Sequence, residues 1–320
     1  MQKGRNMIQD IAPKSLNNQY DPAKKPCASS PVFHFQGKKL LCSVRQDRGP
    51  VQVCVSGPSS VSLTREISFP TYEQAAAAGA FKGGEPSVNG PVPDLSFIFS
   101  VGDDDCFLLR NGDALEIPGF TYEEIGVYRD AFPVENAYAA VTAFHLNNWY
   151  ESERFCGHCG TPLVHDGVER MMRCPKCGNM IFPRINPCVI VGIMHEDKIL
   201  CTQYNRPGSG RFALVAGFCE IGETIEDTVR REVMEEVGIR VKNITFYKSQ
   251  PWAMSSSLLC GFLCEAESED AHADGVELAS ARWFTRDELR ECYTPSHVAL
   301  TSNIITAFMN GEIGPENCRR

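Results

Sequence analysis

Residues 217–239 read GFCEIGETIEDTVRREVMEEVGI, and this stretch determines more of the fold than any other part of the chain. Gly217 is followed after five residues by Glu223, and after seven more by the run Arg231–Ile239. With average residue usage, this set of spaced matches arises by chance well below about once in a million chains of this length. Thr224 with Asp227 three residues later predicts a helix start, and the glycine after Val237 predicts its left-handed stop. We therefore expect a helix over Thr224–Val237.

Three carboxylates share one face of this expected helix. Glu232, Glu235 and Glu236 stand at i, i+3 and i+4, a spacing that brings side chains together on a helix surface. Such hard oxygen ligands suit Mg²⁺ or Mn²⁺, which in turn bind phosphate oxygens. The alternative is a solvated acidic face. An apolar residue at every fourth position from Ile225 to Val237 predicts that the helix docks beside its carboxylates.

Two C-x-x-C pairs, Cys156/Cys159 and Cys174/Cys177, are separated by fourteen residues. Each such turn points two sulfurs at one tetrahedral ion, so the spacing predicts a zinc ribbon. Because four thiolates complete the shell, the ion is expected to be structural. Disulfides or a redox C-x-x-C are the alternatives, and the turn residues beside both pairs disfavour them.

Composition limits the classes of function. The 320 residues carry 31 Lys and Arg against 40 Asp and Glu, and a net charge of -9 argues against general nucleic-acid binding through a basic surface. We find no run near the roughly 20 apolar residues of a membrane span, and Met1–Lys25 lacks the apolar centre of a secretory signal. Of the fifteen cysteines, eleven are scattered singly. A reduced, cytoplasmic chain without membrane contact is expected.

Hydrophobic patterning divides the chain into four parts. We expect a flexible arm over residues 1–30, an α+β domain over 31–150, a zinc ribbon over 151–185 and a catalytic domain over 186–320. The second part has short alternating runs, a hairpin from Leu95 to Leu109, a loop over Lys82–Pro93 and a helix over Glu135–Tyr150. In the fourth part, strands are expected over Cys188–Ile193, Lys198–Gln203, Phe212–Val215, Ile244–Ser249, Leu258–Glu265 and Ala281–Phe284, and helices over Thr285–Cys292 and Ser296–Met309. This order suits an α/β fold in which helices enclose a mixed sheet.

The stretch 217–239 matches the Nudix box, so the chain resembles the Nudix hydrolases, which cleave nucleoside diphosphates linked to another moiety. The segment Ser249–Trp252, SQPW, with Ser257 beyond it, resembles the S-Q-P-W-P-F-P-x-S signature of the NADH pyrophosphatase branch. A zinc ribbon before the Nudix domain is also typical of that branch. The resemblance is close over about residues 155–308. One departure is that Ala253-Met254-Ser255 replaces Pro-Phe-Pro, which removes an aromatic ring and backbone rigidity.

The resemblance implies an α/β/α sandwich and a set of site residues. Glu232, Glu236, Glu277 and the Ala216 carbonyl would hold Mg²⁺ or Mn²⁺, with Glu235 nearby. For Glu277, a lone loop glutamate, simple solvent exposure is the alternative. We expect Arg231 to orient Glu223 through a charge-assisted pair.

The resemblance also implies a dinucleotide pocket. Phe218 and Phe182 match positions whose rings enclose the nicotinamide across a dimer interface, although the residues alone equally suggest core aromatics. The remaining pocket residues implied are Glu169, Gln250, Pro251, Trp252, Ser257 and Ala299. The implied active unit is a homodimer.

The implied activity is hydrolysis of the pyrophosphate of NADH or NAD⁺ to AMP and nicotinamide mononucleotide. The same bond occurs in NAD-capped RNA, whose cap some members of the branch remove. A broader dinucleotide or ADP-ribose pyrophosphatase is the enzymatic alternative. A Nudix-fold sensor without hydrolysis is the other, and the complete set of glutamates counts against it.

Overall fold

The computed structural model describes residues 7–46, 49–56, 59–81, 94–110, 112–206, 212–296 and 298–319, with the backbone alone for 53–56 and 59–60. Internal contacts divide the chain into two compact units. The first combines Met1–Asp10, Gln52–Val61 and Ile185–Arg320, and the second combines Ile11–Val51 and Ser62–Arg184. The predicted ribbon therefore clusters with the predicted N-terminal domain, and the four boundaries expected from sequence stay a prediction.

The first unit is built on a six-stranded mixed sheet. Its strands are β17 (Val241–Trp252), β18 (Ser257–Ala266), β14 (Asn186–His195), β15 (Lys198–Tyr204) and β19 (Leu278–Thr285), in that order, with β16 (Val215–Phe218) beside β14. β14 and β18 run parallel, and the other pairs are antiparallel. The expected mixed sheet is confirmed.

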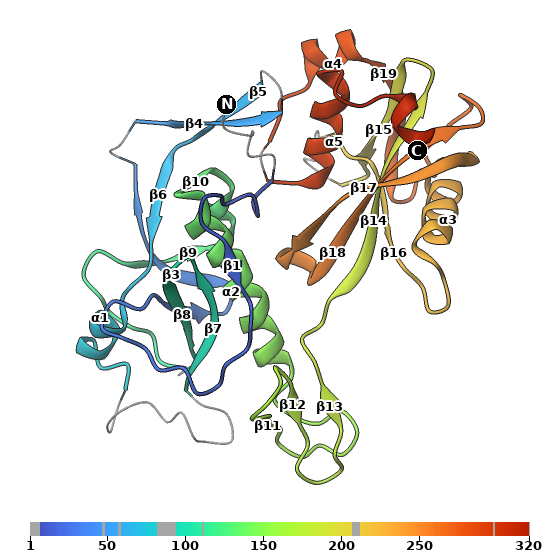
Figure 1. Cartoon of the computed structure of the whole chain (residues 1–320). Helices are drawn as coiled ribbons and strands as arrows, with labels where there is room; N and C mark the ends of the chain where they lie inside the picture. Colours follow the sequence, from blue (N-terminus) through green and yellow to red (C-terminus); the bar gives the residue numbers. More distant parts are fainter. Residues whose placement is uncertain are drawn as a thin grey trace. The chain divides into compact units, whose positions relative to one another are not determined.

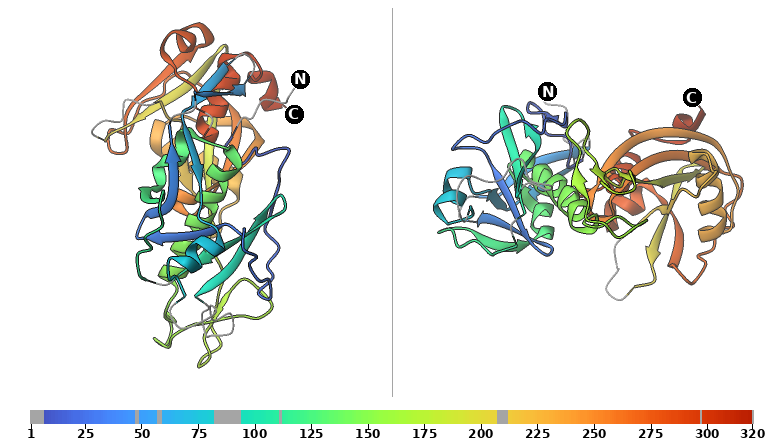
Figure 2. Two further views of the ribbon diagram at one scale, coloured as in Figure 1. Left: turned by 90° about the vertical axis from the view of Figure 1, so that its left-hand side faces the viewer. Right: turned by 90° about the horizontal axis from the view of Figure 1, so that it is seen from below.

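Helices cover both faces of this sheet, as Figure 1 and the two further views in Figure 2 show. α3 (Ile225–Val237) buries Val229, Val233 and Val237 against one face. α5 (Leu300–Met309) packs on the other, together with α4 (Arg286–Cys292). Gly192 permits the approach of α5, because a Cβ there would lie 2.8 Å from Ile304 Cγ2. The α/β sandwich expected from sequence is therefore present.

The second unit contains an eight-stranded sheet and the long helix α2 (Val134–Ser152). The sheet is formed by β1 (Leu16–Asn17), β7 (Leu95–Val101), β8 (Asp104–Leu109), β2 (Val32–Gln36), β3 (Lys39–Arg45), β6 (Arg65–Ser68) and β10 (Ala131–Phe132), with β9 (Thr121–Glu124) beside β3. A small three-stranded sheet follows, of β11 (Val164–His165), β12 (Met172–Arg173) and β13 (Met180–Ile181). The remaining elements of the chain are β4 (Val51–Ser56), β5 (Ser59–Leu63), α1 (Tyr72–Ala77), η1 (Ile125–Asp130), η2 (Ala253–Ser255) and η3 (Pro315–Arg319).

Three expectations about the elements are wrong. The strand expected at Phe212–Val215 lies at Val215–Phe218, because pairing with β14 fixes its register there. The last helix starts at Leu300 rather than Ser296, because Ala299 is extended, with φ -117° and ψ 142°.

The third wrong expectation is the flexible arm. Residues 7–30 pack against the rest of the protein, because Met7, Ile8 and Ile11 are buried and β1 pairs with β7. The expected loop Lys82–Pro93 lies outside the described residues. Among the described helices, we find none with the length and apolar character needed to cross a bilayer.

Candidate functional site

The helix expected from the 217–239 stretch is confirmed as α3, and local contacts explain both of its ends. The Thr224 hydroxyl oxygen accepts the Asp227 N–H at 3.1 Å and so caps the start. Gly238 ends the helix in the left-handed conformation, with φ 71°. These two ends fix which residues face the sheet and which carboxylates project beside it.

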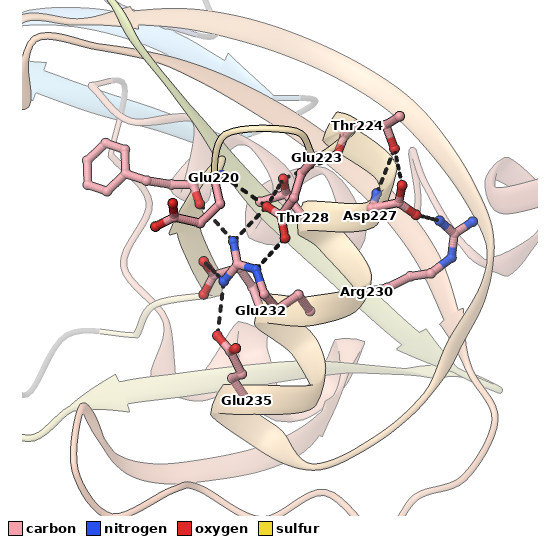
Figure 3. Close-up of polar contacts among 10 residues, drawn as sticks. Glu220, Glu223, Thr224, Asp227, Thr228, Arg230, Glu232 and Glu235 are labelled. Carbon is pink, nitrogen blue, oxygen red and sulfur yellow. Dashed lines mark hydrogen bonds and ion pairs between the residues drawn. The ribbon is translucent and has the colours of Figure 1, made fainter.

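Three glutamates converge on one guanidinium group, that of Arg231 (Figure 3). Its Nε lies 2.6 Å from Glu223 Oε1, and its Nη1 lies 2.7 Å from Glu232 Oε1 and 3.0 Å from Glu235 Oε2. Its Nη2 also donates to the Phe218 carbonyl at 2.9 Å. Hydrogen bonds from Arg231 lower the pKa of Glu223 to about 2. The expected charge-assisted pair is present, and it ties α3 to the preceding strand and loop.

Position 217 must be a glycine for a steric reason. A Cβ on residue 217 would lie 1.8 Å from Glu232 Cδ, inside the carboxylate itself. The Glu232 side chain is 12% exposed and lies directly against the backbone of β16. Glycine at 217 therefore lets α3 place a carboxylate at the edge of the sheet.

Glu236 is the buried carboxylate of α3, with 5% exposure. Its Oε2 has no hydrogen-bond partner among the described residues. Burial, followed by the negative charges of Glu232 and Glu277, raises the pKa of Glu236 to about 8, although a hydrogen bond from the Ala216 backbone opposes the rise. A buried carboxylate beside two others is costly unless a cation or a proton is shared among them.

The loop that contains Asp274 brings Glu277 near Glu232 and Glu236. The Asp274 carboxylate accepts the backbone N–H groups of Val276, Glu277 and Leu278 at 2.9–3.2 Å. The Asp274 N–H in turn donates to the Glu236 carbonyl at 3.1 Å. This anchor holds Glu277 where its charge acts on both Glu232 and Glu236. Aspartate three residues ahead of Glu277 was the available sequence signal.

The residues present fit a divalent cation. Glu232, Glu236 and Glu277 offer the hard oxygens that Mg²⁺ and Mn²⁺ prefer, and the orphaned Glu236 Oε2 is a buried acceptor that an ion would satisfy. Among the described residues, oxygens taken one from each of these three carboxylates do not all lie within 4.8 Å of one another, and Glu232 is held by Arg231 at 2.7 Å.

The raised pKa of Glu236 gives a prediction for the protein in EDTA. Below the ordinary pKa of a glutamate, the Glu236 carboxyl is protonated in both the folded and the unfolded protein. Between that value and about 8 the folded protein retains a proton that the unfolded chain releases, so stability falls as pH rises through this window. Between pH 5.5 and 8, wild type should lose about 5 °C of Tm relative to Glu236→Gln. Parallel Tm curves for the two proteins would refute the assignment.

The four cysteines of the two C-x-x-C pairs come together in the second unit. The ligand sulfurs of Cys156, Cys159, Cys174 and Cys177 all lie within 4.8 Å of one another. Three Sγ–Sγ distances are 3.5–3.6 Å, near the roughly 3.8 Å edge of a tetrahedron with Zn–S bonds of about 2.3 Å. A side-chain hydrogen bond with Thr161 lowers the pKa of Cys159 to about 6, which favours thiolate. The geometry is that of a structural zinc site.

Two aromatic rings expected either in the pocket or in the core are exposed. Phe218 on β16 is 49% exposed and Phe182 after β13 is 51% exposed, so the core alternative is wrong for both. Glu169 is exposed beside the Asp166 turn, which accepts its N–H at 3.0 Å. Phe182 and Glu169 belong to the second compact unit, and Phe218 belongs to the first.

The remaining residues expected in the pocket lie in and after β17 or directly before α5. Pro251 is exposed, and Trp252 packs partly against the apolar cluster that contains Leu300. Ser257 is buried, and its hydroxyl lies 2.8 Å from that of Ser255. Ala299 directly precedes α5.

Direct substrate contact by the Gln250 side chain is contradicted. This side chain is completely buried, its Oε1 accepts the Leu300 N–H at 2.7 Å, and its Nε2 donates to the Val298 carbonyl at 2.6 Å. Both ends of the amide are therefore occupied by backbone groups. A bound nucleotide could not hydrogen-bond to Gln250 without breaking these contacts.

Comparison with protein families assigns two parts of the chain. Residues 185–304 match the NUDIX domain, and residues 151–182 match the NADH pyrophosphatase zinc ribbon domain. The chain therefore contains a Nudix domain preceded by a zinc ribbon of the NADH pyrophosphatase type. The ribbon match covers the four cysteines, and the Nudix match covers the whole of α3 and Glu277.

Curated relatives match the same region. A protein of Salmonella schwarzengrund named NAD-capped RNA hydrolase NudC is 44% identical over 154 residues, which are 48% of this chain and 60% of that relative. The protein of the same name from Salmonella paratyphi B is 43% identical over the same shares. The match thus spans about three fifths of the length of these relatives. A crystal structure of a NUDIX hydrolase from Nitrosomonas europaea aligns with a TM-score of 0.44 and 23% identity, covering 51% of this chain and 94% of that one.

Proposed function

We propose that this chain, with its Nudix domain behind an NADH pyrophosphatase zinc ribbon, hydrolyses the pyrophosphate bond of NADH or NAD⁺ to AMP and nicotinamide mononucleotide. The observation that carries the proposal is the buried carboxylate of Glu236, whose Oε2 has no hydrogen-bond partner among the described residues, beside Glu232 and Glu277. The NAD-capped RNA hydrolase relatives support a dinucleotide substrate, which includes the NAD cap of an RNA 5′ end.

The geometry of the site supports a role for each residue in this proposal. Glu232, Glu236 and Glu277 would hold Mg²⁺ or Mn²⁺ together with the Ala216 carbonyl. When bound, such an ion neutralises charge on pyrophosphate oxygens and lowers the pKa of a bound water. Arg231 keeps Glu223, Glu232 and Glu235 in place, and Gly217 leaves room for Glu232. A carboxylate of this group accepts the proton of the attacking water.

The proposed environment is an active homodimer in the cytoplasm. Phe218 and Phe182 expose their rings, as residues that enclose a nicotinamide across a subunit interface would need to do. The family matches place the zinc ribbon directly before the Nudix domain, so each subunit would supply both parts.

A broader ADP-ribose pyrophosphatase is favoured by one observation. Where the NADH pyrophosphatase signature has Pro-Phe-Pro, this chain forms the short turn η2 from Ala253-Met254-Ser255, which offers no aromatic ring. A pocket without that ring gains less from the nicotinamide of NADH.

A substrate panel tests the proposal. Purified protein with Mg²⁺ or Mn²⁺ is given NADH, NAD⁺, ADP-ribose or NAD-capped RNA, and kcat/KM is compared. We expect NADH or the NAD cap to be preferred over ADP-ribose. A clear preference for ADP-ribose would support the broader activity, and no hydrolysis of any of the four would reject catalysis.

Replacing Trp252 with alanine should lower kcat/KM for NADH by about 10-fold, and for ADP-ribose by less. The reason is that Trp252 supports the pocket from the end of β17 and packs against the Leu300 cluster. Trp283→Ala, on β19 of the same sheet, is the matched control. The control should leave the ratio of kcat/KM for NADH to that for ADP-ribose unchanged, and if Trp252→Ala also leaves it unchanged, the SQPW segment is scaffold alone.

A further inference from the structure

The first residues described belong to the same compact unit as the Nudix sheet. Met7 is buried in the apolar cluster that also holds Leu259 and Leu300. A tight turn follows, in which the Asp10 N–H donates to the Met7 carbonyl at 2.9 Å and the Met7 N–H donates to Asp10 Oδ2 at 3.0 Å. This turn presents Gln9 to strand β17.

Gln250 caps helix α5 from a neighbouring strand. The N-cap residue is Ala299, which has no side-chain acceptor for the first N–H groups of the helix. Gln250 Oε1 supplies that acceptor for Leu300, while its Nε2 binds the Val298 carbonyl on the other side of Ala299. One buried amide therefore fixes the backbone on both sides of Ala299.

Gln9 continues this chain of hydrogen bonds to the N-terminal turn. Its Oε1 accepts from Gln250 Nε2 at 3.3 Å, and its Nε2 donates to the Ser249 carbonyl at 3.2 Å. Two glutamines thus connect residue 9 to the Leu300 N–H without interruption. We call this chain the glutamine bridge.

The held segment contacts the neighbours of the candidate site. Leu300 is completely buried, and a Cβ at Gly261 would lie 3.0 Å from its Cδ2, so the first turn of α5 rests directly on β18. Trp252 and Ala216 pack against the same cluster. A shift of Leu300 would therefore change the packing of Trp252, which belongs to the proposed pocket, and of Ala216, which belongs to the proposed metal site.

We propose that the glutamine bridge is a positioning device for the dinucleotide pocket, with Gln250 and Gln9 as its two positioning residues. It holds Val298–Leu300 in place, so substrate affinity depends on the N-terminal turn Met7–Asp10 as well as on the Nudix domain. This inference rests on the proposed function for its substrate, but the order of Val298–Leu300 can be measured without any substrate.

The kinetic test uses full-length protein with Mg²⁺ and NADH. Gln250→Met keeps the volume and removes all three side-chain hydrogen bonds of Gln250, and should raise KM by about 10-fold with kcat within about two-fold of wild type. Gln9→Met should raise KM by about three-fold. Because the bridge is continuous, the double variant should raise KM by less than the product of the two single effects.

Thr245→Val is the matched control on the same strand. It removes the 2.9 Å hydrogen bond from Thr245 to the Cys318 carbonyl of η3, which is not part of the glutamine bridge. It should leave KM unchanged even if it lowers Tm. A glutamine variant that lowers Tm and kcat with KM unchanged, as a merely structural change would, overturns the proposal.

Amide hydrogen exchange supplies the readout that needs no substrate. A peptide covering residues 298–303 should exchange faster in Gln250→Met and Gln9→Met than in wild type or Thr245→Val. Unchanged exchange in both glutamine variants overturns the proposal whatever the kinetics. Should Gln250→Met fail to fold, Gln9→Met alone decides. If wild type leaves NADH intact while exchange responds as expected, the proposed function fails and the bridge stands.

Discussion

Replacing Glu236 with glutamine is expected to lower NADH turnover by about 10² or more at saturating Mg²⁺, while the fold persists. Glutamine keeps the shape of the side chain but removes the charge that a divalent cation needs. The effect is expected to be large because Glu236 is the buried member of the glutamate group, with one oxygen that has no described partner. Steady-state rates at several Mg²⁺ concentrations provide the measurement.

Glu226→Gln is the matched control, because Glu226 lies exposed in the first turn of the same helix. It should retain wild-type turnover. Turnover of Glu236→Gln near that of wild type would remove Glu236 from the site, and equal losses in the two variants would point to general charge on α3 instead.

Replacing Cys174 with serine is expected to abolish stoichiometric zinc binding and to lower Tm by about 5 °C or more. Folding of such ribbons is coupled to the metal, so a missing thiolate leaves the two turns untied. Elemental analysis after dialysis should show one zinc per chain in wild type and much less in the variant. Cys292→Ser, at an exposed free cysteine, should keep its zinc. Wild-type protein without zinc, or with iron in its place, would contradict the ribbon assignment.

Local signals predicted the parts of the structure that local contacts build. The ends of α3 follow from Thr224 and Gly238, whose capping contacts lie within a few residues along the chain. The cysteine cluster follows from two short turns of fixed geometry. The Arg231–Glu223 pair spans one loop, and its charges made it predictable.

Contacts between segments that are distant in the sequence could not be predicted from local sequence patterns. Attachment of residues 7–30 depends on β7 and on the apolar cluster that takes up Met7, which nothing within the segment reveals. Gln250 reads as a polar residue suited to a ligand, yet the approach of α5 buries it. The late start of α5 has the same cause, because Ala299 is extended where Gln250 holds its neighbours.

The position of Glu277 near Glu236 was predicted only from the resemblance to the NADH pyrophosphatase branch, because the two residues are far apart in the sequence. Glu277 lies about forty residues beyond α3, and its place beside Glu236 depends on the Asp274 turn and its bond to the Glu236 carbonyl. The residues alone left solvent exposure as the alternative for Glu277, and Glu277 is exposed in the structure. Its role as a metal ligand remains a proposal that Glu277→Gln kinetics can test alongside Glu236→Gln.

The central claim is metal-dependent hydrolysis of the pyrophosphate bond of NADH, and product analysis in H₂¹⁸O tests it most directly. Purified protein with Mg²⁺ or Mn²⁺ should convert NADH to AMP and reduced nicotinamide mononucleotide, with one ¹⁸O on a phosphate of one product. Chelation by EDTA should stop the reaction. Release of nicotinamide with the pyrophosphate intact, or NADH that remains unchanged beside an active control enzyme, would contradict the account.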